Sequence, residues 1–310
     1  MDAPGTAPGP PYDPATFWNG VAWRLRARGF DPDLTGPAGP VHRYKRDVLL
    51  AKLFSLLPVE GASVLEFGCG PGWNLRALAG RGPARLVGAD VAREMVKLAR
   101  RDTSAEIVQL DGGRLPFEDR EFDCAFTHAV LQHNHAEALP SILTELTRVT
   151  RSTLVLIEDT TAWRERSSGG SYWVRRNQSY IAPVTARGFR LLDVTGADVW
   201  ATDTTWLAMQ RLASLTGRPA RAEGAAGSAW EYRLDRAALL LTRRLDRFFP
   251  QLSGKTALRF QRPAAPGAPG QLAAQAGLGV LGGGAVEAGY AGGHCQPQLA
   301  GEQPGRIGVD

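Results

Sequence analysis

Residues 64–72 read Val-Leu-Glu-Phe-Gly-Cys-Gly-Pro-Gly, and they carry the strongest indication of the fold. A mostly apolar run leads into an acid, and three glycines then alternate with other residues before a new apolar pattern begins at Trp73 and Leu75. The pattern predicts a buried strand, a turn and the start of a helix. Glycines in the turn permit positive φ and a close approach to a ligand, and the free N–H groups of a helix N-terminus favour an anionic group.

Two further apolar runs also end in an acid. Asp90 follows the run 86–89, and Asp111 follows the run 107–110. Ligands of an open parallel sheet sit outside the carboxyl ends of its strands, so we expect both acids to lie near the glycine-rich turn. There Asp90 can accept hydrogen bonds from ribose hydroxyls, and Asp111 can accept one from an adenine amino group. The series predicts a site for an adenosine-containing ligand.

The spacing of the glycines distinguishes two kinds of nucleotide site. Dinucleotide-binding folds use G-x-G-x-x-G. Here Gly68, Gly70 and Gly72 form G-x-G-x-G, with Glu66 two residues before the first glycine. A carboxylate at that position is unfavourable beside a pyrophosphate and suits a cationic ammonium group. A nicotinamide-dependent oxidoreductase therefore stays an alternative against which the spacing argues.

Residues 64–159 resemble the class I S-adenosylmethionine (SAM) dependent methyltransferases, whose first motif has the form E/D-x-G-x-G-x-G. Residues 87–95 are similar to the second motif of that family, and residues 115–123 are similar to the lead-in to its fourth strand. The resemblance implies a doubly wound, Rossmann-like α/β sheet of seven strands with the last strand antiparallel. It also implies N-terminal helices, a helical insertion before the last strand, and SAM as the cofactor.

The resemblance assigns the cofactor contacts residue by residue. Glu66 and the glycine turn would hold the methionine end of SAM, Asp90 would hold the ribose, and Asp111 with Gly112 would meet the adenine edge. The expected cofactor-binding residues are Glu66, Gly68, Cys69, Gly70, Gly72, Asp90, Val91, Met95, Asp111, Gly112 and Thr127.

The candidate catalytic residues lie in the segment 127–134, which reads Thr-His-Ala-Val-Leu-Gln-His-Asn. In the family that it resembles, this loop passes close to the transferred methyl group. His133 and His128 are therefore candidate general bases, because histidine titrates near neutrality and can take a hydroxyl proton. The alternative for each is a solvent-facing or helix-capping histidine. A neutral amine acceptor would need no base, since positioning then carries the rate.

The predicted function is methyl transfer to a hydroxyl or amine of a small molecule, such as a secondary metabolite or a sugar-like compound. A non-catalytic adaptor that keeps the fold stays open as another reading. The N/D-P-P-Y/F motif of base amino-methylation is absent, and Thr127-His128-Ala129-Val130 stands in its place. That difference argues against a nucleic-acid acceptor. The sequence leaves the oligomeric state open.

The chain divides into three expected parts. Residues 1–40 form a leader and a short helix, residues 41–263 form the methyltransferase domain with a helical insertion at about 196–254, and residues 264–310 form a low-complexity tail that we expect to be disordered. Within the domain, strands alternate with helices from residue 63 to residue 157, which predicts a parallel sheet covered on both faces. Beyond the alternating region we expect one helix over 173–187 and strands over 188–194 and 256–261.

The bulk composition sets the broad class. The 310 residues carry a net charge of +5, with 44% hydrophobic and 22% charged residues, as in globular proteins of the soluble class. The N-terminus lacks the apolar core of a signal peptide, and no run approaches the ~18 apolar residues of a membrane span. Cys69, Cys124 and Cys295 show no zinc-binding spacing, so we expect no metal site. Free thiols fit a cytoplasmic protein.

Overall fold

The computed structural model describes residues 12–27, 40–168, 170–199 and 254–263, together with a few residues between 208 and 246. Most of the predicted insertion and the whole predicted tail lie outside the described residues, so both stay predictions. Two helices precede the sheet, α1 (Pro14–Ala27) and α2 (Pro40–Leu56). Among the described helices, none combines the length and the apolar composition that a bilayer span requires.

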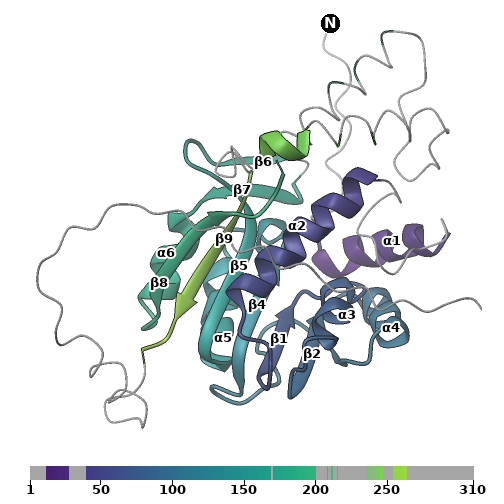
Figure 1. Ribbon diagram of the computed structural model, residues 1–310. Helices are drawn as coiled ribbons and strands as arrows, with labels where there is room; N and C mark the ends of the chain where they lie inside the picture. Colours follow the sequence, from purple (N-terminus) through teal and green to yellow (C-terminus); the bar gives the residue numbers. More distant parts are fainter. Residues whose placement is uncertain are drawn as a thin grey trace, which may run out of the picture. The chain divides into compact units, whose positions relative to one another are not determined.

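In the described residues, seven strands form the centre of a nine-stranded sheet, in the order β3-β2-β1-β4-β5-β9-β8 (Figure 1). Neighbours from β3 through β5 are parallel, and β9 is antiparallel to both β5 and β8. The predicted sheet with an antiparallel last strand is therefore confirmed. The strands are β1 (Ser63–Phe67), β2 (Arg85–Asp90), β3 (Glu106–Gln109), β4 (Phe122–His128), β5 (Thr150–Thr161), β8 (Arg190–Gly196) and β9 (Lys255–Gln261).

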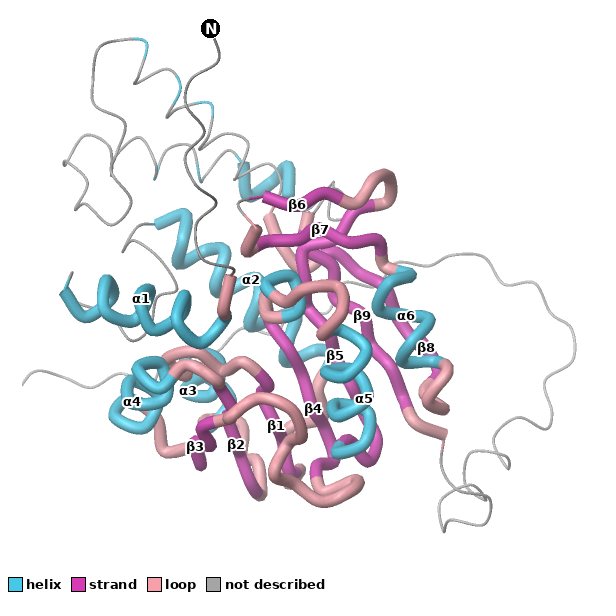
Figure 2. Tube along the Cα trace, turned by 180° about the vertical axis from the view of Figure 1, so that it is seen from behind, coloured by secondary structure: helices cyan, strands magenta, loops and turns pink. Residues whose placement is uncertain are grey.

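Helices cover both faces of this sheet (Figures 1 and 2). Between residues 60 and 199 the described helices are α3 (Trp73–Ala79), α4 (Arg93–Asp102), the 3-10 turn η1 (Leu131–His133), α5 (Leu139–Val149) and α6 (Gln178–Thr185). Val64 packs with α2, α3 and α4 on one face, and its neighbour Leu65 packs with α5 and α6 on the other. Because both faces are covered, the central strands β1, β2 and β4 are buried almost throughout, whereas β8 at the edge alternates between partly buried and exposed residues.

A β-hairpin replaces the first part of a predicted helix. The expected single helix over 173–187 is wrong at its start, because Tyr172–Arg176 form strand β7, which pairs antiparallel with β6 (Arg166–Ser168). Strand β5 runs on to Thr161 and offers β7 a parallel edge. The helix begins only at Gln178. The sequence holds a signal for this hairpin, since the Ser/Gly-rich residues 167–171 precede an aromatic and β-branched run.

Candidate active site

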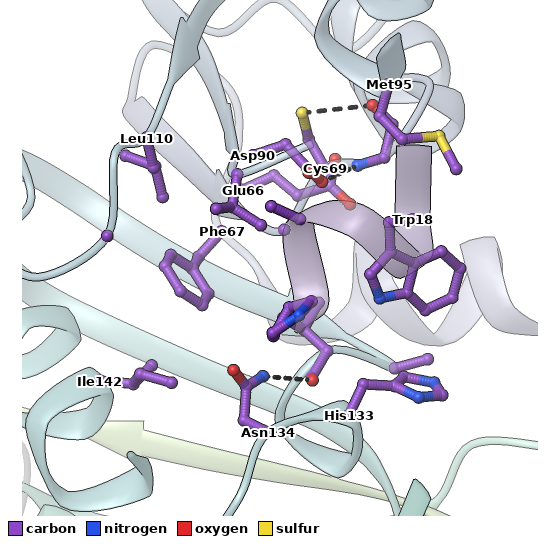
Figure 3. Close-up of a pocket in the computed structure, with 18 of the residues that line it drawn as sticks. Trp18, Glu66, Phe67, Cys69, Asp90, Met95, Leu110, His133, Asn134 and Ile142 are labelled. Atoms are coloured by element: carbon purple, nitrogen blue, oxygen red, sulfur yellow. Dashed lines mark hydrogen bonds between the residues drawn. The ribbon is translucent and has the colours of Figure 1, made fainter. Parts of the chain in front are cut away.

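A cavity of about 800 Å³ lies at the carboxyl ends of strands β1 to β4. Its wall combines the glycine turn after β1, the ends of β2 and β3, the loop after β4 and one face of α1. In Figure 3, Trp18 of α1 lies across from Phe67 and Leu110. Both candidate bases line this cavity, and so do all the predicted cofactor residues except Gly72 and Thr127.

The three glycines of the turn have different roles. Gly68 has φ of +71°, and a Cβ there would lie 2.5 Å from the Val130 side chain, so the close packing of two loops requires glycine. Gly72 has φ of +84°, and a Cβ there would lie 2.5 Å from the Thr103 side chain. A Cβ on Gly70, at φ of +52°, would meet nothing within 4 Å. Gly70 is therefore the open position of the turn, whereas Gly72 serves the packing of α3 against α4.

Glu66 brings a buried carboxyl to the cavity wall. Its side chain is 2% exposed, and Oε1 accepts a 2.7 Å hydrogen bond from Nδ2 of Asn74. Oε2 is buried without a hydrogen-bond partner among the described residues. Burial raises the pKa of Glu66 to about 8, and the Asn74 hydrogen bond and the charge of Arg46 only partly oppose this shift. A cation next to Oε2 would stabilise the ionised carboxyl and supply the missing partner.

Asp90 ties the end of β2 to the glycine turn. Its Oδ2 accepts a 2.8 Å hydrogen bond from the amide of Gly70, and Oδ1 accepts one of 2.8 Å from the amide of Ala92. Burial raises the pKa of Asp90, and these backbone N–H groups counter the shift in part. Each carboxylate oxygen keeps a further lone pair for a donor in the cavity. Asp111 and Gly112 lie just beyond β3 and are exposed at the cavity edge.

Thr127 serves the loop after β4 rather than the cavity. Its fully buried hydroxyl donates a 2.7 Å hydrogen bond to Oε1 of Glu158 in β5. The amides of Val130 and Gln132 donate to the two oxygens of the same carboxyl, each at 3.3 Å. Gln132 and Asp159 also exchange two hydrogen bonds, of 2.9 and 2.7 Å. Two acids of β5 thus hold the loop that carries both histidines, Glu158 through the backbone amides of the loop and Asp159 through the side chain of Gln132.

The first of these histidines, His128, sits deep in the wall. Its Nδ1 is 3.4 Å from Nδ2 of Asn74, and an amide nitrogen can only donate. Nδ1 therefore accepts, and the ring proton of neutral His128 is on Nε2. Burial, assisted by the charge of Lys255, lowers the pKa of His128 to about 3. The basic lone pair of this ring is engaged by Asn74.

The second histidine, His133, has the opposite arrangement. Its Nδ1 lies 2.9 Å from the carbonyl oxygen of Ser171, which can only accept. Nδ1 therefore carries the proton, and the lone pair of neutral His133 is on Nε2. Burial lowers the pKa of His133 below its usual value, and the Ser171 carbonyl opposes this in part. The ring of Trp18 packs edge-to-face on the imidazole, with centroids 5.0 Å apart.

The N-terminal helices supply site residues that motif reading missed. Pro14, Trp18, Val21 and Leu25 share one face of α1 and line the cavity. The helical spacing of these apolar residues can be seen in the sequence. The same spacing occurs in helices that cover a ligand and in helices that pack in the core, so it does not distinguish the two. Asn19 fixes this helix, because its Oδ1 accepts a 2.9 Å hydrogen bond from the amide of Glu94 at the start of α4.

Arg46 of α2 is a further charged residue near the site. It is 9% exposed, and its guanidinium donates a 2.5 Å hydrogen bond to the carbonyl of Trp73 at the start of α3. Its positive charge lowers the pKa of Glu66 against the effect of burial. The sequence contains a signal for it, because Arg46 lies on the same helix face as the core residues Leu49 and Leu53.

Part of the chain matches known proteins. Residues 64–153 match the sequence model of a family described as a methyltransferase domain. The chain is 46% identical over 79 residues to an uncharacterized 37.1 kDa protein in transposon TN4556 of Streptomyces fradiae, which covers 24% of this chain and 23% of that protein. It is 28% identical over 127 residues to 24-methylenesterol C-methyltransferase 2 of Arabidopsis thaliana, which covers 39% of this chain and 34% of that one. Each match spans only about a quarter to a third of the relative.

The fold extends the similarity over more of the chain. The crystal structure of the [4+2]-cyclase SpnF superposes with a TM-score of 0.53 at 17% identity. The superposition covers 81% of this chain and 96% of that one. At this identity the likeness concerns the fold alone.

Proposed function

We propose that this protein transfers a methyl group from SAM to a small-molecule acceptor, because residues 64–153 match the sequence model of the methyltransferase domain family. The observation that carries the proposal is the buried carboxyl of Glu66, whose Oε2 has no hydrogen-bond partner among the described residues and which lines a cavity also bounded by Gly70 and Asp90. The ammonium end of SAM would favour ionisation of this carboxyl and pair with it, whereas a pyrophosphate would oppose its ionisation.

The residues of the cavity would fit SAM in four respects. Oε2 of Glu66 offers an acceptor to an ammonium group, and the open position at Gly70 leaves room for a ligand against the backbone. The oxygens of Asp90 keep lone pairs for ribose hydroxyls, and Asp111 with Gly112 would meet the adenine edge. SAM supplies a methyl group that its sulfonium has already activated, so the protein mainly has to position the acceptor and to keep water out.

His133 is the residue that we assign as general base. Its Nε2 lone pair is available because Nδ1 donates to Ser171, and its lowered pKa keeps the ring neutral at pH 7. In transfer to a hydroxyl acceptor, this Nε2 would accept the hydroxyl proton as the oxygen–methyl bond forms, and the electron pair of the broken carbon–sulfur bond would stay on the sulfur of SAM. His128 is a poorer base, because Asn74 engages its Nδ1 and its pKa is about 3.

The acceptor that we propose is therefore a hydroxyl compound, with an amine as the second possibility. A hydroxyl must lose a proton during transfer at neutral pH, and a base with a free lone pair contributes most there. Trp18 and its neighbours on α1 would cover the reacting groups and exclude water. In a secondary metabolite or a sugar-like compound, the hydroxyl would approach from the side of His133.

The test is a transfer assay with SAM that carries an isotope-labelled methyl group. The purified full chain is incubated with a panel of phenols, sugar alcohols and amines, and labelled products are identified by mass spectrometry. We expect transfer to at least one hydroxyl compound, and loss of that transfer in His133→Ala. A protein that binds SAM but labels no compound of the panel would instead favour the non-catalytic adaptor.

A further inference from the structure

The β6–β7 hairpin contacts the loop that carries His133 from one side. The Ser171 carbonyl accepts the Nδ1 proton of His133, and the Tyr172 hydroxyl donates a 2.7 Å hydrogen bond to Oδ2 of Asp159. Asp159 in turn binds Gln132, the residue before His133. The hairpin therefore reaches the imidazole directly at its tip and indirectly through β5.

Arg175 of β7 holds the same loop by its backbone. The residue is 5% exposed, and its guanidinium donates a 2.8 Å hydrogen bond to the carbonyl of Leu131 and one of 2.5 Å to the carbonyl of Asn134. Leu131 is the first residue of η1 and Asn134 directly follows it, so the two carbonyls lie on either side of His133 in the chain. A planar guanidinium that bridges two carbonyls fixes their relative position more tightly than a single contact can. Arg175 thus fixes where the His133 ring stands relative to Ser171.

We propose that Arg175 and the hairpin tip are positioning elements that hold His133 in the tautomer with the proton on Nδ1. The proposal rests on the proposed function, because only this tautomer leaves Nε2 free to accept a proton from the acceptor. The Trp18 ring and the Tyr172 ring, with centroids 5.0 and 5.6 Å from the imidazole, limit its rotation away from the carbonyl.

A purely structural role for Arg175 makes a different prediction. If Arg175 only stabilised the loop, its replacement would lower the melting temperature and leave the proton on Nδ1. If it positions His133, replacement loosens the Nδ1–Ser171 hydrogen bond, and the ring then populates both neutral tautomers. The location of the ring proton therefore separates the two roles without any knowledge of the acceptor.

The experiment is long-range ¹H–¹⁵N NMR of the histidine side chains in the full-length protein, recorded across the neutral pH range. The His133 signals are identified by their absence in His133→Gln. We expect wild-type His133 to be neutral at pH 7, with Nδ1 protonated and Nε2 unprotonated. A proton on Nε2 in the wild type would overturn the proposal at once.

Three variants at Arg175 and its neighbour test the positioning role. In Arg175→Met we expect a mixture of tautomers and a His133 pKa that moves back toward its usual value, whereas Arg175→Lys should restore the wild-type spectrum in part. The matched control is Arg176→Met, because the side chain of Arg176 is 62% exposed and lies 3.9 Å from the carboxylate of Glu165. A wild-type spectrum in folded Arg175→Met would contradict the proposal.

A variant at the hairpin tip tests the proposal if Arg175→Met fails to fold. Gly170, next to Ser171 at the hairpin tip, has φ of +67°, and a Cβ there would meet nothing within 4 Å. Gly170→Val strains the tip without overpacking the core and should displace the Ser171 carbonyl, again giving mixed tautomers. An unchanged His133 spectrum in this variant would also count against the proposal.

The proposed function is tested separately by SAM binding. If SAM binds and the His133 proton is on Nε2, methyl transfer survives as the function and the positioning proposal fails. If the proton is on Nδ1 but SAM does not bind, the hairpin holds the ring as described and the proposed function fails.

Discussion

The two sides of the cavity are built in different ways. On the side of the glycine turn, Glu66, Gly70 and Asp90 come from strand ends, and each is held by backbone or by a residue close in the chain. On the side of the loop after β4, His133 is held by Ser171 and packed by Trp18, which are far away in the sequence. The side that we propose for the cofactor is therefore specified by local motifs. The side that we propose for catalysis depends on tertiary contacts. We call them the cofactor side and the catalytic side.

The largest expected effect belongs to the catalytic side. With a hydroxyl acceptor, His133→Ala should lower turnover by ~10²–10⁴-fold, which is the usual contribution of a general base. SAM affinity, measured by calorimetry, should barely change, because the assigned cofactor contacts come from other loops. The wild-type rate should fall as pH drops through the His133 pKa, and burial sets this pKa below ~6.5.

His128→Ala is the matched control for that experiment. Since Asn74 engages the lone pair of His128, its replacement should leave the acid limb of the pH–rate profile in place. Full activity in His133→Ala together with a collapse in His128→Ala would reverse the assignment. Full activity in both variants would mean that proximity alone carries the reaction.

The next largest effect is a loss of stability where the glycine turn packs against the loop after β4. Gly68→Ala places a Cβ 2.5 Å from the Val130 side chain at a positive φ, so overpacking and backbone strain add up to roughly 2–5 kcal/mol of lost stability. Gly70→Ala has the strain alone, about 1–2 kcal/mol. Chemical denaturation of both variants measures the difference. Equal losses would show that the two loops can separate freely.

A smaller effect is expected within the cofactor side. Asp90→Ala should weaken SAM binding by roughly 1–3 kcal/mol, the typical cost of lost hydrogen bonds to a charged group. Because Asp90 also accepts from the amide of Gly70, Asp90→Asn is the better matched variant, since it keeps one acceptor oxygen for the turn. Titration calorimetry gives the affinities. Wild-type affinity in both variants would remove Asp90 from the cofactor site.

The smallest expected effect is the number of protons released when SAM binds. With a pKa of about 8, Glu66 is mostly protonated at pH 7 before SAM binds. A bound cation favours the ionised carboxyl and lowers that pKa, so binding at pH 7 should release up to about one proton. Binding enthalpies measured in buffers of different ionisation heat give this number, and Glu66→Gln should lose the release. An identical count in wild type and Glu66→Gln would show that Glu66 does not face the cation.

The contrast between local motifs and tertiary contacts also explains which features could be predicted from the sequence. The parallel strands and the glycine turn follow from strand-end motifs, because periodicity and turn chemistry are local properties. The antiparallel last strand was implied by the family resemblance and does not follow from those local patterns. The roles of Gly72 and Thr127 do not follow, since only packing shows that Gly72 meets Thr103 and that Thr127 bonds Glu158. The motif identifies such residues without saying which way they face.

The β6–β7 hairpin shows that local sequence can also leave the type of secondary structure undecided. Its turn signal at 167–171 is present in the sequence, but the apolar residues that follow it also fit a helix. The pairing of β7 with the end of β5 decides between them, and that edge exists only once the sheet has formed. The position of Ser171 next to His133, and with it the choice of tautomer, is therefore a tertiary property.

The central claim is that the cavity at the glycine turn binds SAM, and isothermal titration calorimetry of the full chain tests it most directly. SAM and its demethylated product S-adenosylhomocysteine share the ammonium, ribose and adenine groups that the site would recognise. We expect saturable one-to-one binding of both ligands, weakened by Glu66→Gln, and no binding of NADH. An absence of binding heat with both ligands at concentrations far above the protein, at two temperatures, would contradict the account.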